Sequence, residues 1–123
     1  AGINHHFLSI ENTKIANAIC ADTSSPIHAK TCATLGTDVY LAGVLYSPMC
    51  YDKDIQLLSS YAKEYDMLVG MANHNKTTGP HTGIGKSTFW DKDGLIISAN
   101  ERDDVLVMAE KIDSKWIGEI VEL

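Results

Sequence analysis

Hydrophobic residues along the chain gather in short runs that polar and glycine-containing segments separate. Two largely apolar runs, Lys14–Cys20 and Asp38–Val44, have the length and composition of strands buried in a sheet. Met67–Asn73 predicts a third strand of the same kind. The other runs with strand character cover His5–Ile10, Lys86–Trp90, Leu95–Ser98, Asp104–Ala109 and Trp116–Val121.

Segments between the first strands carry helix signals. Ser25 can cap a helix, and Pro26 suits the first helical position because its missing N–H costs nothing there. This helix is predicted to run to about Leu35 and to stop at Gly36. A second helix is predicted from about Asp52 to Glu64, where apolar residues recur at spacings of three and four: Ile55, Leu58, Ala62 and Tyr65.

Turn residues indicate how the elements connect. Glu11-Asn12-Thr13 and Asp91-Lys92-Asp93-Gly94 each separate two strands, which predicts hairpins. His74–Gly85 holds three glycines and a proline and is predicted to be a loop. Strand–helix–strand–helix–strand implies βαβ units followed by an antiparallel hairpin edge. The predicted fold class is therefore mixed α and β.

Composition limits the classes of protein. A chain of 123 residues with 45% apolar content can build one compact domain, so we interpret residues 1–123 as a single unit. Its net charge is −6 and its ten basic residues are scattered, which argues against a nucleic-acid partner. No apolar stretch approaches the ~18–20 residues that span a bilayer, and no secretory signal is recognisable, so no membrane partner is expected.

The cysteines are Cys20, Cys32 and Cys50, an odd number without CxxC spacing. This pattern favours neither a disulfide framework nor a zinc cage. We therefore expect free thiols in a reducing, cytoplasmic compartment, with no bound metal or cofactor. The sequence opens at Ala1 without an initiator methionine, which suggests processing, truncation or a further upstream part.

Cys20 lies where a predicted strand gives way to a predicted helix. In such sheets this junction is at the carboxyl edge, where ligands usually bind. The backbone N–H groups that follow, and the nearby helix N-terminus, favour the thiolate and can stabilise an oxyanion. Position alone also allows a plain alternative, that Cys20 is a small buried apolar residue.

The residues around Cys20 resemble a known motif. Ala18–Pro26 (AICADTSSP) is similar to the nucleophile motif of the nitrilase superfamily, in which an apolar strand leads into Ile-Cys-x-Asp and a proline opens the helix. Further blocks of that family are matched in order along the chain: Leu35–Leu41, Met71-Ala72-Asn73 with Gly79, Gly85-Lys86-Ser87, and Asp91–Gly94. The sequence departs from the usual pattern at Ile27 and His28, where family members often carry Glu directly after the proline, and at Thr37.

This resemblance implies a thiol-dependent hydrolase of non-peptide C–N bonds, in amides, carbamoyl compounds or nitriles. The family uses a Glu–Lys–Cys triad and a thioester intermediate. Only the cysteine maps here, as Cys20, with the Ala21 N–H serving the oxyanion. The family's Glu and Lys lie upstream of this chain, and Glu11 and Lys14 do not replace them because they flank a hairpin turn at the far end of the strand.

The family fold is a four-layer αββα sandwich of about twice this length. The resemblance therefore implies that the chain is the C-terminal half of one hydrolase domain, partnered by its upstream half, by a small amide or nitrile substrate, and by further copies in a homo-oligomer. We expect Tyr46, Ser47 and Asn73 to line the substrate pocket, because they follow strand C-termini. Which substrate is used does not follow from the sequence.

Alternative interpretations remain open at this point. The chain could be a truncated or diverged half-domain that acts only by association, since the Glu and Lys are missing. A Cys–His hydrolase would use His28, His74 or His81 as its base. The spacing of His28 and Cys32 on one helix could hold a metal but is usually incidental, and the His5-His6 pair is a feature of the first strand or the terminus.

Overall fold

The computed structural model describes residues 6–76 and 83–123. Gly79, His81 and His5, which the sequence analysis singled out, lie outside these ranges. The elements are β1 (His6–Ile10), β2 (Thr13–Ile19), the 3₁₀ turn η1 (Cys20–Ser24), α1 (Pro26–Thr34), β3 (Val39–Val44), α2 (Tyr51–Tyr65), β4 (Leu68–Asn73), β5 (Thr88–Asp91), β6 (Gly94–Ser98), β7 (Val105–Ile112) and β8 (Lys115–Glu122).

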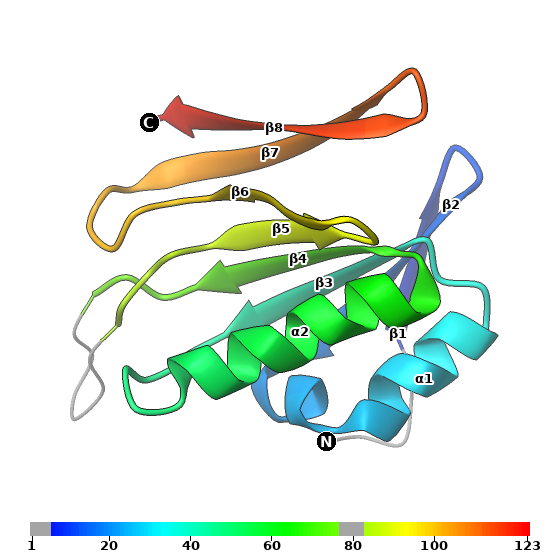
Figure 1. Cartoon of the computed structure of the whole chain (residues 1–123), viewed down its shortest axis with the longest axis horizontal. Coiled ribbons are helices and arrows are strands. Elements are labelled where there is room, and N and C mark those ends of the chain that lie inside the picture. The colour runs from blue at the N-terminus through cyan, green and yellow to red at the C-terminus, as the bar shows by residue number, and fades with distance from the viewer. Residues whose placement is uncertain (1–5, 77–82) are drawn as a thin grey trace.

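Strands β1 to β6 form one sheet in sequence order within the described residues (Figure 1). Strands β2, β3 and β4 are parallel, and the neighbouring pairs β1–β2, β4–β5 and β5–β6 are antiparallel. The crossovers β2–α1–β3 and β3–α2–β4 are the predicted βαβ units. Helix α1 ends where predicted, because Gly36 adopts a φ of +88° that other residues reach only with strain.

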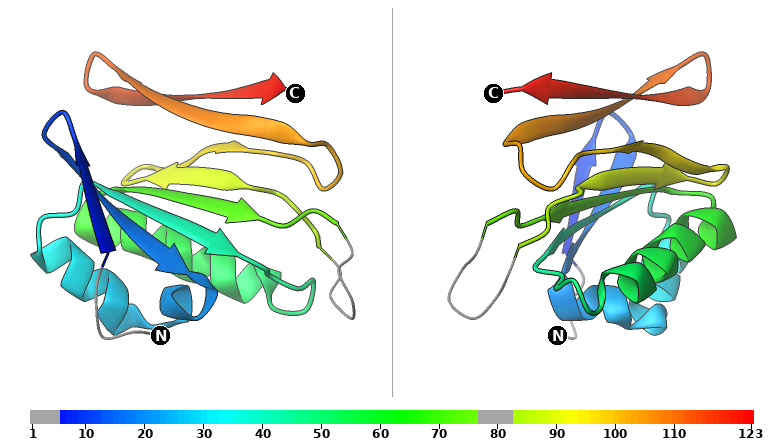
Figure 2. Two further views of the ribbon diagram at one scale, coloured as in Figure 1. Left: turned by 180° about the vertical axis from the view of Figure 1, so that it is seen from behind. Right: turned by 60° about the vertical axis from the view of Figure 1, so that its left-hand side comes forward.

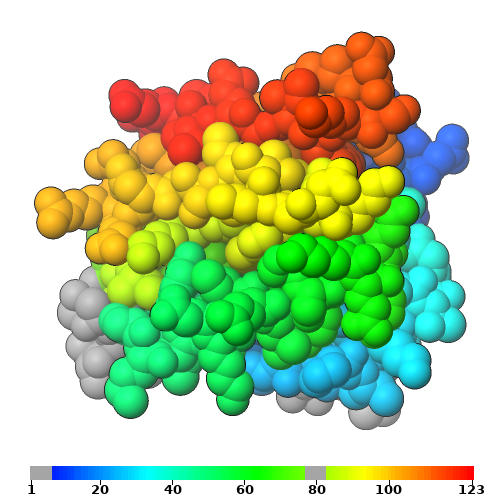
Figure 3. Space-filling model, viewed as in Figure 1, coloured from blue at the N-terminus to red at the C-terminus, as the bar shows by residue number. Residues whose placement is uncertain are grey.

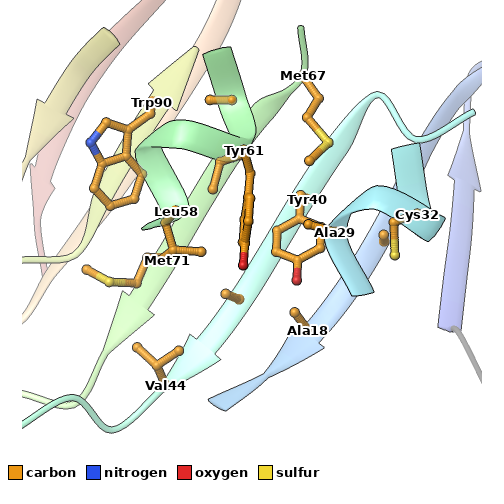
Figure 4. Close-up of a cluster of buried hydrophobic side chains, with 14 of the residues drawn as sticks. Ala18, Ala29, Cys32, Tyr40, Val44, Leu58, Tyr61, Met67, Met71 and Trp90 are labelled. Carbon is orange, nitrogen blue, oxygen red and sulfur yellow. The ribbon is translucent and has the colours of Figure 1, made fainter. Parts of the chain in front are cut away.

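Helices α1 and α2 cover the same face of this sheet, and the core lies between them (Figure 1). The predicted stripe of α2 is confirmed: Leu58 and Ala62 are fully buried, and Ile55 and Tyr65 pack on the core. Figure 4 shows Tyr61 of α2 beside Tyr40 of β3, and their ring centroids are 6.0 Å apart in an edge-on arrangement. This edge-to-face geometry is favourable for aromatic pairs.

Within residues 6–76 and 83–123, no helix lies on the opposite face of the parallel strands (Figure 2, left). Along β2, Ala16 and Ala18 are buried toward the helices, whereas Asn17 and Ile19 are exposed. Ile19 is 72% exposed. The apolar run of β2 was predicted to be a buried strand; in the described residues only one of its faces is covered, so the prediction is half right.

Strands β7 and β8 form a separate two-stranded ribbon that lies against β6. The contact is close, since a Cβ placed on Gly118 would lie 2.5 Å from Ile97. In the space-filling view, the residues of β6 lie between α2 and the ribbon (Figure 3). The ribbon is longer than predicted, because its turn is only Asp113-Ser114, and both residues have positive φ, as a two-residue hairpin turn requires.

One face of the ribbon remains apolar and accessible. Leu106 and Met108 of β7 are about half exposed, as is Ile117 of β8. Two carboxylates interrupt this face, with Glu119 paired opposite Met108 and Glu110 opposite Ile117. Among the described residues, no helix has the length and apolar character needed to cross a membrane.

The core position of Leu58 gives a direct test of the packing. Leu58 is 0% exposed, so we expect Leu58→Ala to lower the free energy of unfolding by about 2–5 kcal/mol, through lost burial and the cavity left behind. Leu95, which is 65% exposed, is the matched control: Leu95→Ala should change stability by no more than about 0.5 kcal/mol. Urea denaturation followed by circular dichroism measures both, and equal losses would contradict the described packing.

Candidate active site

The carboxyl ends of three parallel strands meet at one edge of the sheet. In the register, Ile19 pairs with Gly43, and Gly43 pairs with Ala72. The residues that follow these strands, including Cys20, Tyr46 and the strand-terminal Asn73, are therefore brought together. This edge is where ligand-binding residues of parallel sheets collect.

Cys20 opens the 3₁₀ turn η1 directly after β2. It was predicted to be the last strand residue; instead its φ is +35°, a left-handed value that is strained for a non-glycine residue. Its side chain is half-buried, whereas Cys32 is buried and Cys50 exposed. Ser25 was predicted to cap α1, but in the described part of the chain its side chain makes no capping hydrogen bond.

Hydrogen bonds hold the turn on several sides. The carboxylate of Asp22 accepts the N–H of Ile19 at 3.1 Å. The hydroxyl of Thr23 donates to the carbonyl of Cys20 at 2.6 Å. The N–H of Leu45, the residue after β3, donates to the Cys20 sulfur at 3.5 Å. The carbonyl of Cys20 is thus held from within η1, and its sulfur is tied to the segment that follows β3.

A buried pair of tyrosines lies behind this turn. The Thr23 hydroxyl is 2.5 Å from the hydroxyl of Tyr46, and the Thr23 carbonyl accepts from the hydroxyl of Tyr61 at 2.8 Å. Because the Thr23 proton is already given to the Cys20 carbonyl, the Tyr46 hydroxyl must be the donor to Thr23. Burial raises the pKa of both Tyr46 and Tyr61 to about 12, which keeps these hydroxyls protonated.

The residues predicted to line a pocket are placed as follows. The hydroxyl of Tyr46 points inward to Thr23, while its N–H donates to the amide oxygen of Asn73 at 2.9 Å. The amide nitrogen of Asn73 donates to the carbonyl of Gly85 at 2.9 Å, so both ends of this buried side chain are engaged. Ser47 is half-buried beside them, and Ala21 is exposed on η1.

The histidine and cysteine of α1 form a second buried group. His28 Nδ1 is 2.9 Å from the Tyr40 hydroxyl, and the Cys32 sulfur is 4.0 Å from the same nitrogen. Burial, reinforced by the negative charge of Asp22, raises the pKa of the Cys32 thiol, so Cys32 is a poor nucleophile. In the described ranges no three His, Cys, Asp or Glu residues are grouped as a metal site requires.

Lys14 lies at the opposite end of β2 from Cys20. Its Nζ donates to the carbonyl of Leu35 at 2.6 Å, and its N–H donates to the carboxylate of Asp38 at 2.8 Å. Lys14 therefore secures the start of β3, in line with its exclusion from the site.

An apolar groove of about 490 Å³ runs along the uncovered sheet face, and Ile19, the last residue of β2, is among its lining residues. Ile19, Leu41 and Gly43 form its floor, together with Ala72 of β4. Leu106 of β7 lines it from the side. The groove thus continues from the residue that precedes Cys20 into the space beneath the ribbon.

The arrangement of helices, parallel strands and ribbon matches part of the fold of solved carbon–nitrogen hydrolases of the nitrilase superfamily. Nit3 from Saccharomyces cerevisiae, a member of branch 10 of that superfamily, superposes with a TM-score of 0.76 at 15% identity, over 98% of this chain and 42% of its own. A CN-hydrolase superfamily protein from Xanthomonas campestris gives 0.75 at 15% identity, over 99% of this chain and 45% of its own.

The same fold occurs in the glutamine-dependent NAD+ synthetase from Acinetobacter baumannii. Its TM-score is 0.81 at 18% identity, over 94% of this chain and 23% of that protein. The chain therefore spans less than half the length of these structures. No protein-family model and no curated protein sequence matches it.

Sequence reasoning missed part of what holds Cys20 in place. Thr23 and Asp22 belong to the quoted motif, and their spacing from Cys20 is typical of short polar side chains that bond the backbone of a turn. Leu45 contributes only a backbone N–H, for which no residue type gives a signal. The predicted stripe of α2 does not include Tyr61, which is buried and lies one position before Ala62.

The raised tyrosine pKa values make stability depend on alkaline pH. Unfolded tyrosines titrate near pH ~10, whereas Tyr46 and Tyr61 stay protonated to about 12 in the folded state. Above pH ~10 the unfolded chain releases protons that the folded chain keeps, so the free energy of unfolding falls between pH ~10 and about 12 and is unaffected by these groups at lower pH. We expect a shallower fall in Tyr46→Phe, measured by urea denaturation across that range. Identical slopes in the variant and the wild type would contradict the assignment.

Proposed function

We propose that this chain is the C-terminal half of a carbon–nitrogen hydrolase domain and that Cys20 is its nucleophile. The observation that carries the proposal is the position of Cys20, which sits half-buried at the carboxyl edge of the parallel strands in a strained turn. Strained backbone of this kind clusters at active sites. The nitrilase-superfamily fold supports the same role.

The reaction follows from a thiolate at this position. The sulfur attacks the carbonyl carbon of an amide, and the C=O electron pair moves to oxygen to give a tetrahedral oxyanion, to which we assign the N–H of Ala21 as a donor. Collapse of this intermediate breaks the C–N bond, and the nitrogen leaves as an amine after accepting a proton. Water then attacks the thioester, which releases a carboxylic acid and restores the thiol.

The chain supplies part of the machinery. A general base is needed to take the thiol proton and return it to the leaving amine, and a cation is needed beside the oxyanion. In the proposed enzyme these are the Glu and Lys of the upstream half. In this proposal Ser47 borders the substrate at the strand ends, and Tyr46 and Asn73 form the buried wall behind it.

A related structure supports covalent chemistry in this fold. A Glu-to-Gln mutant of the amidase from Nesterenkonia sp. AN1, of the nitrilase superfamily, was observed with the acetamide moiety of fluoroacetamide covalently added at its active-site cysteine. It superposes with a TM-score of 0.71 at 16% identity and is matched over 42% of its length. A linear amide is therefore the first substrate to test.

We propose that the upstream half of the domain packs on the uncovered sheet face. Ile19, Leu41 and the face of the β7–β8 ribbon present apolar surface that a second sheet layer would bury. That layer would complete the four-layer αββα sandwich and close the groove along this sheet face. Further copies of the completed domain would then assemble through other surfaces as a homo-oligomer.

The nucleophile can be tested by alkylation. In the protein that carries both halves of the domain, we expect iodoacetamide to label Cys20 roughly tenfold faster than the more exposed Cys50, because an active-site base generates the thiolate. Peptide mass spectrometry distinguishes the two sites. Cys20→Ser should lower kcat on linear amides by about 10⁴-fold or more, while the control Cys50→Ser should leave it unchanged. Slower labelling of Cys20 than of Cys50, with activity kept in Cys20→Ser, would refute the proposal.

Association can be tested on residues 1–123 alone. We expect this polypeptide to bind a hydrophobic dye and to self-associate in light scattering, because its apolar sheet face is accessible. It should hydrolyse no amide. Co-expression with the upstream half should lower dye binding and yield an active complex. Monomeric behaviour without dye binding would count against the proposal that the upstream half packs on this sheet face.

A further inference from the structure

The strained backbone of Cys20 requires an explanation of what holds it. A non-glycine residue in the left-handed region costs on the order of 1–3 kcal/mol and persists only when its surroundings fix it. Two hydrogen bonds hold Cys20 in this conformation, one at its carbonyl and one at its sulfur. The carbonyl accepts from Thr23 at 2.6 Å, and the sulfur accepts from the N–H of Leu45 at 3.5 Å.

These contacts belong to one closed circuit. The Tyr46 hydroxyl donates to Thr23, Thr23 donates to the Cys20 carbonyl, and Leu45, the residue covalently joined to Tyr46, donates to the Cys20 sulfur. The two-residue segment after β3 therefore holds both the backbone and the nucleophilic atom of Cys20. Thr23 is the member through which the backbone half of the circuit runs.

The circuit is buried and anchored on further elements. Thr23 is 2% exposed and Tyr46 is 5% exposed, so water does not compete for their hydroxyls. The Thr23 carbonyl accepts from Tyr61 of α2, and the Tyr46 N–H donates to Asn73 at the end of β4. Helix α2 and strands β3 and β4 thus all bear on the conformation of a single turn.

We propose, on the basis of the proposed function, that Thr23 is a positioning residue, which aims the Cys20 sulfur by joining the Cys20 carbonyl to the hydroxyl of Tyr46. The same contacts assign Tyr46 a second role beside the pocket lining suggested for it. The Tyr46 hydroxyl helps to orient Cys20 through Thr23. The main chain of Tyr46 lies at the edge of the sheet where the substrate is proposed to bind.

The side chain of Thr23 acts through its hydroxyl alone in this circuit. Thr23→Val keeps the shape and removes the hydroxyl, which frees the Cys20 carbonyl and leaves the buried Tyr46 hydroxyl without its acceptor. Thr23→Ser restores the hydroxyl. Thr37 offers a matched control, since it is also a buried threonine, 8% exposed, and its hydroxyl has no hydrogen-bond partner in the described part of the chain.

The experiment uses the protein with both halves of the domain and a linear amide substrate. We expect Thr23→Val to lower kcat about 10- to 100-fold with little change in KM, because a misplaced reacting atom costs catalysis and not substrate binding. Thr23→Ser should recover most of the loss, and Thr37→Val should match the wild type. Tyr46→Phe, which keeps the ring and removes only the donor to Thr23, should lower kcat in the same direction even if Thr23→Val folds poorly.

Alkylation separates the two proposals. In Thr23→Val the iodoacetamide labelling of Cys20 should slow relative to that of Cys50, with circular dichroism confirming that the variant is folded. If wild-type Cys20 is labelled rapidly but Thr23→Val and Tyr46→Phe behave like Thr37→Val, the positioning role is overturned and the nucleophile stands. If wild-type Cys20 is unreactive and Cys20→Ser stays active, both proposals fall.

Discussion

The parallel pairing of β2 with β3 is the constraint on which the site depends. Because Ile19 lies opposite Gly43, the chain that leaves β2 turns beside the chain that leaves β3, and the Cys20 sulfur comes within reach of the Leu45 N–H. A shift of one residue in this register would turn the side chains of β2 to the other face of the sheet. Ala16 and Ala18 oppose such a shift, since they pack beneath the helices where larger or polar residues would not fit.

Much of the fold could be predicted from local pattern. The α2 stripe, the βαβ order and the stop at Gly36 were readable because each depends on residues close together in the sequence. The extent of the ribbon was underestimated, since Asp113 and Ser114 are not the asparagine–glycine pair that usually marks a tight hairpin. The exposure of Ile19 was not predictable from its own strand. An apolar strand indicates that both of its faces need to be buried, but it does not identify the element that buries each face.

The candidate site was only partly accessible to sequence reasoning. Cys20 was found because a motif surrounds it. The bond between Thr23 and Tyr46 spans 23 positions, and that between Tyr61 and Thr23 spans 38, so neither leaves a local signal. Tyr46 was expected at the pocket because it follows a strand, and the direction of its hydroxyl depends on core packing that such a rule does not describe.

The carboxylates on the β7–β8 ribbon have a consequence for solubility. Glu110 and Glu119 stand among accessible apolar residues such as Met108 and Ile117, directly across from them in the register. If two such ribbons stacked face to face, four glutamate carboxylates would lose water, which is costly. These glutamates thus discourage indiscriminate stacking of the ribbon. The apolar residues beside them stay available to a partner surface that pairs the two carboxylates with cations or leaves them in contact with solvent.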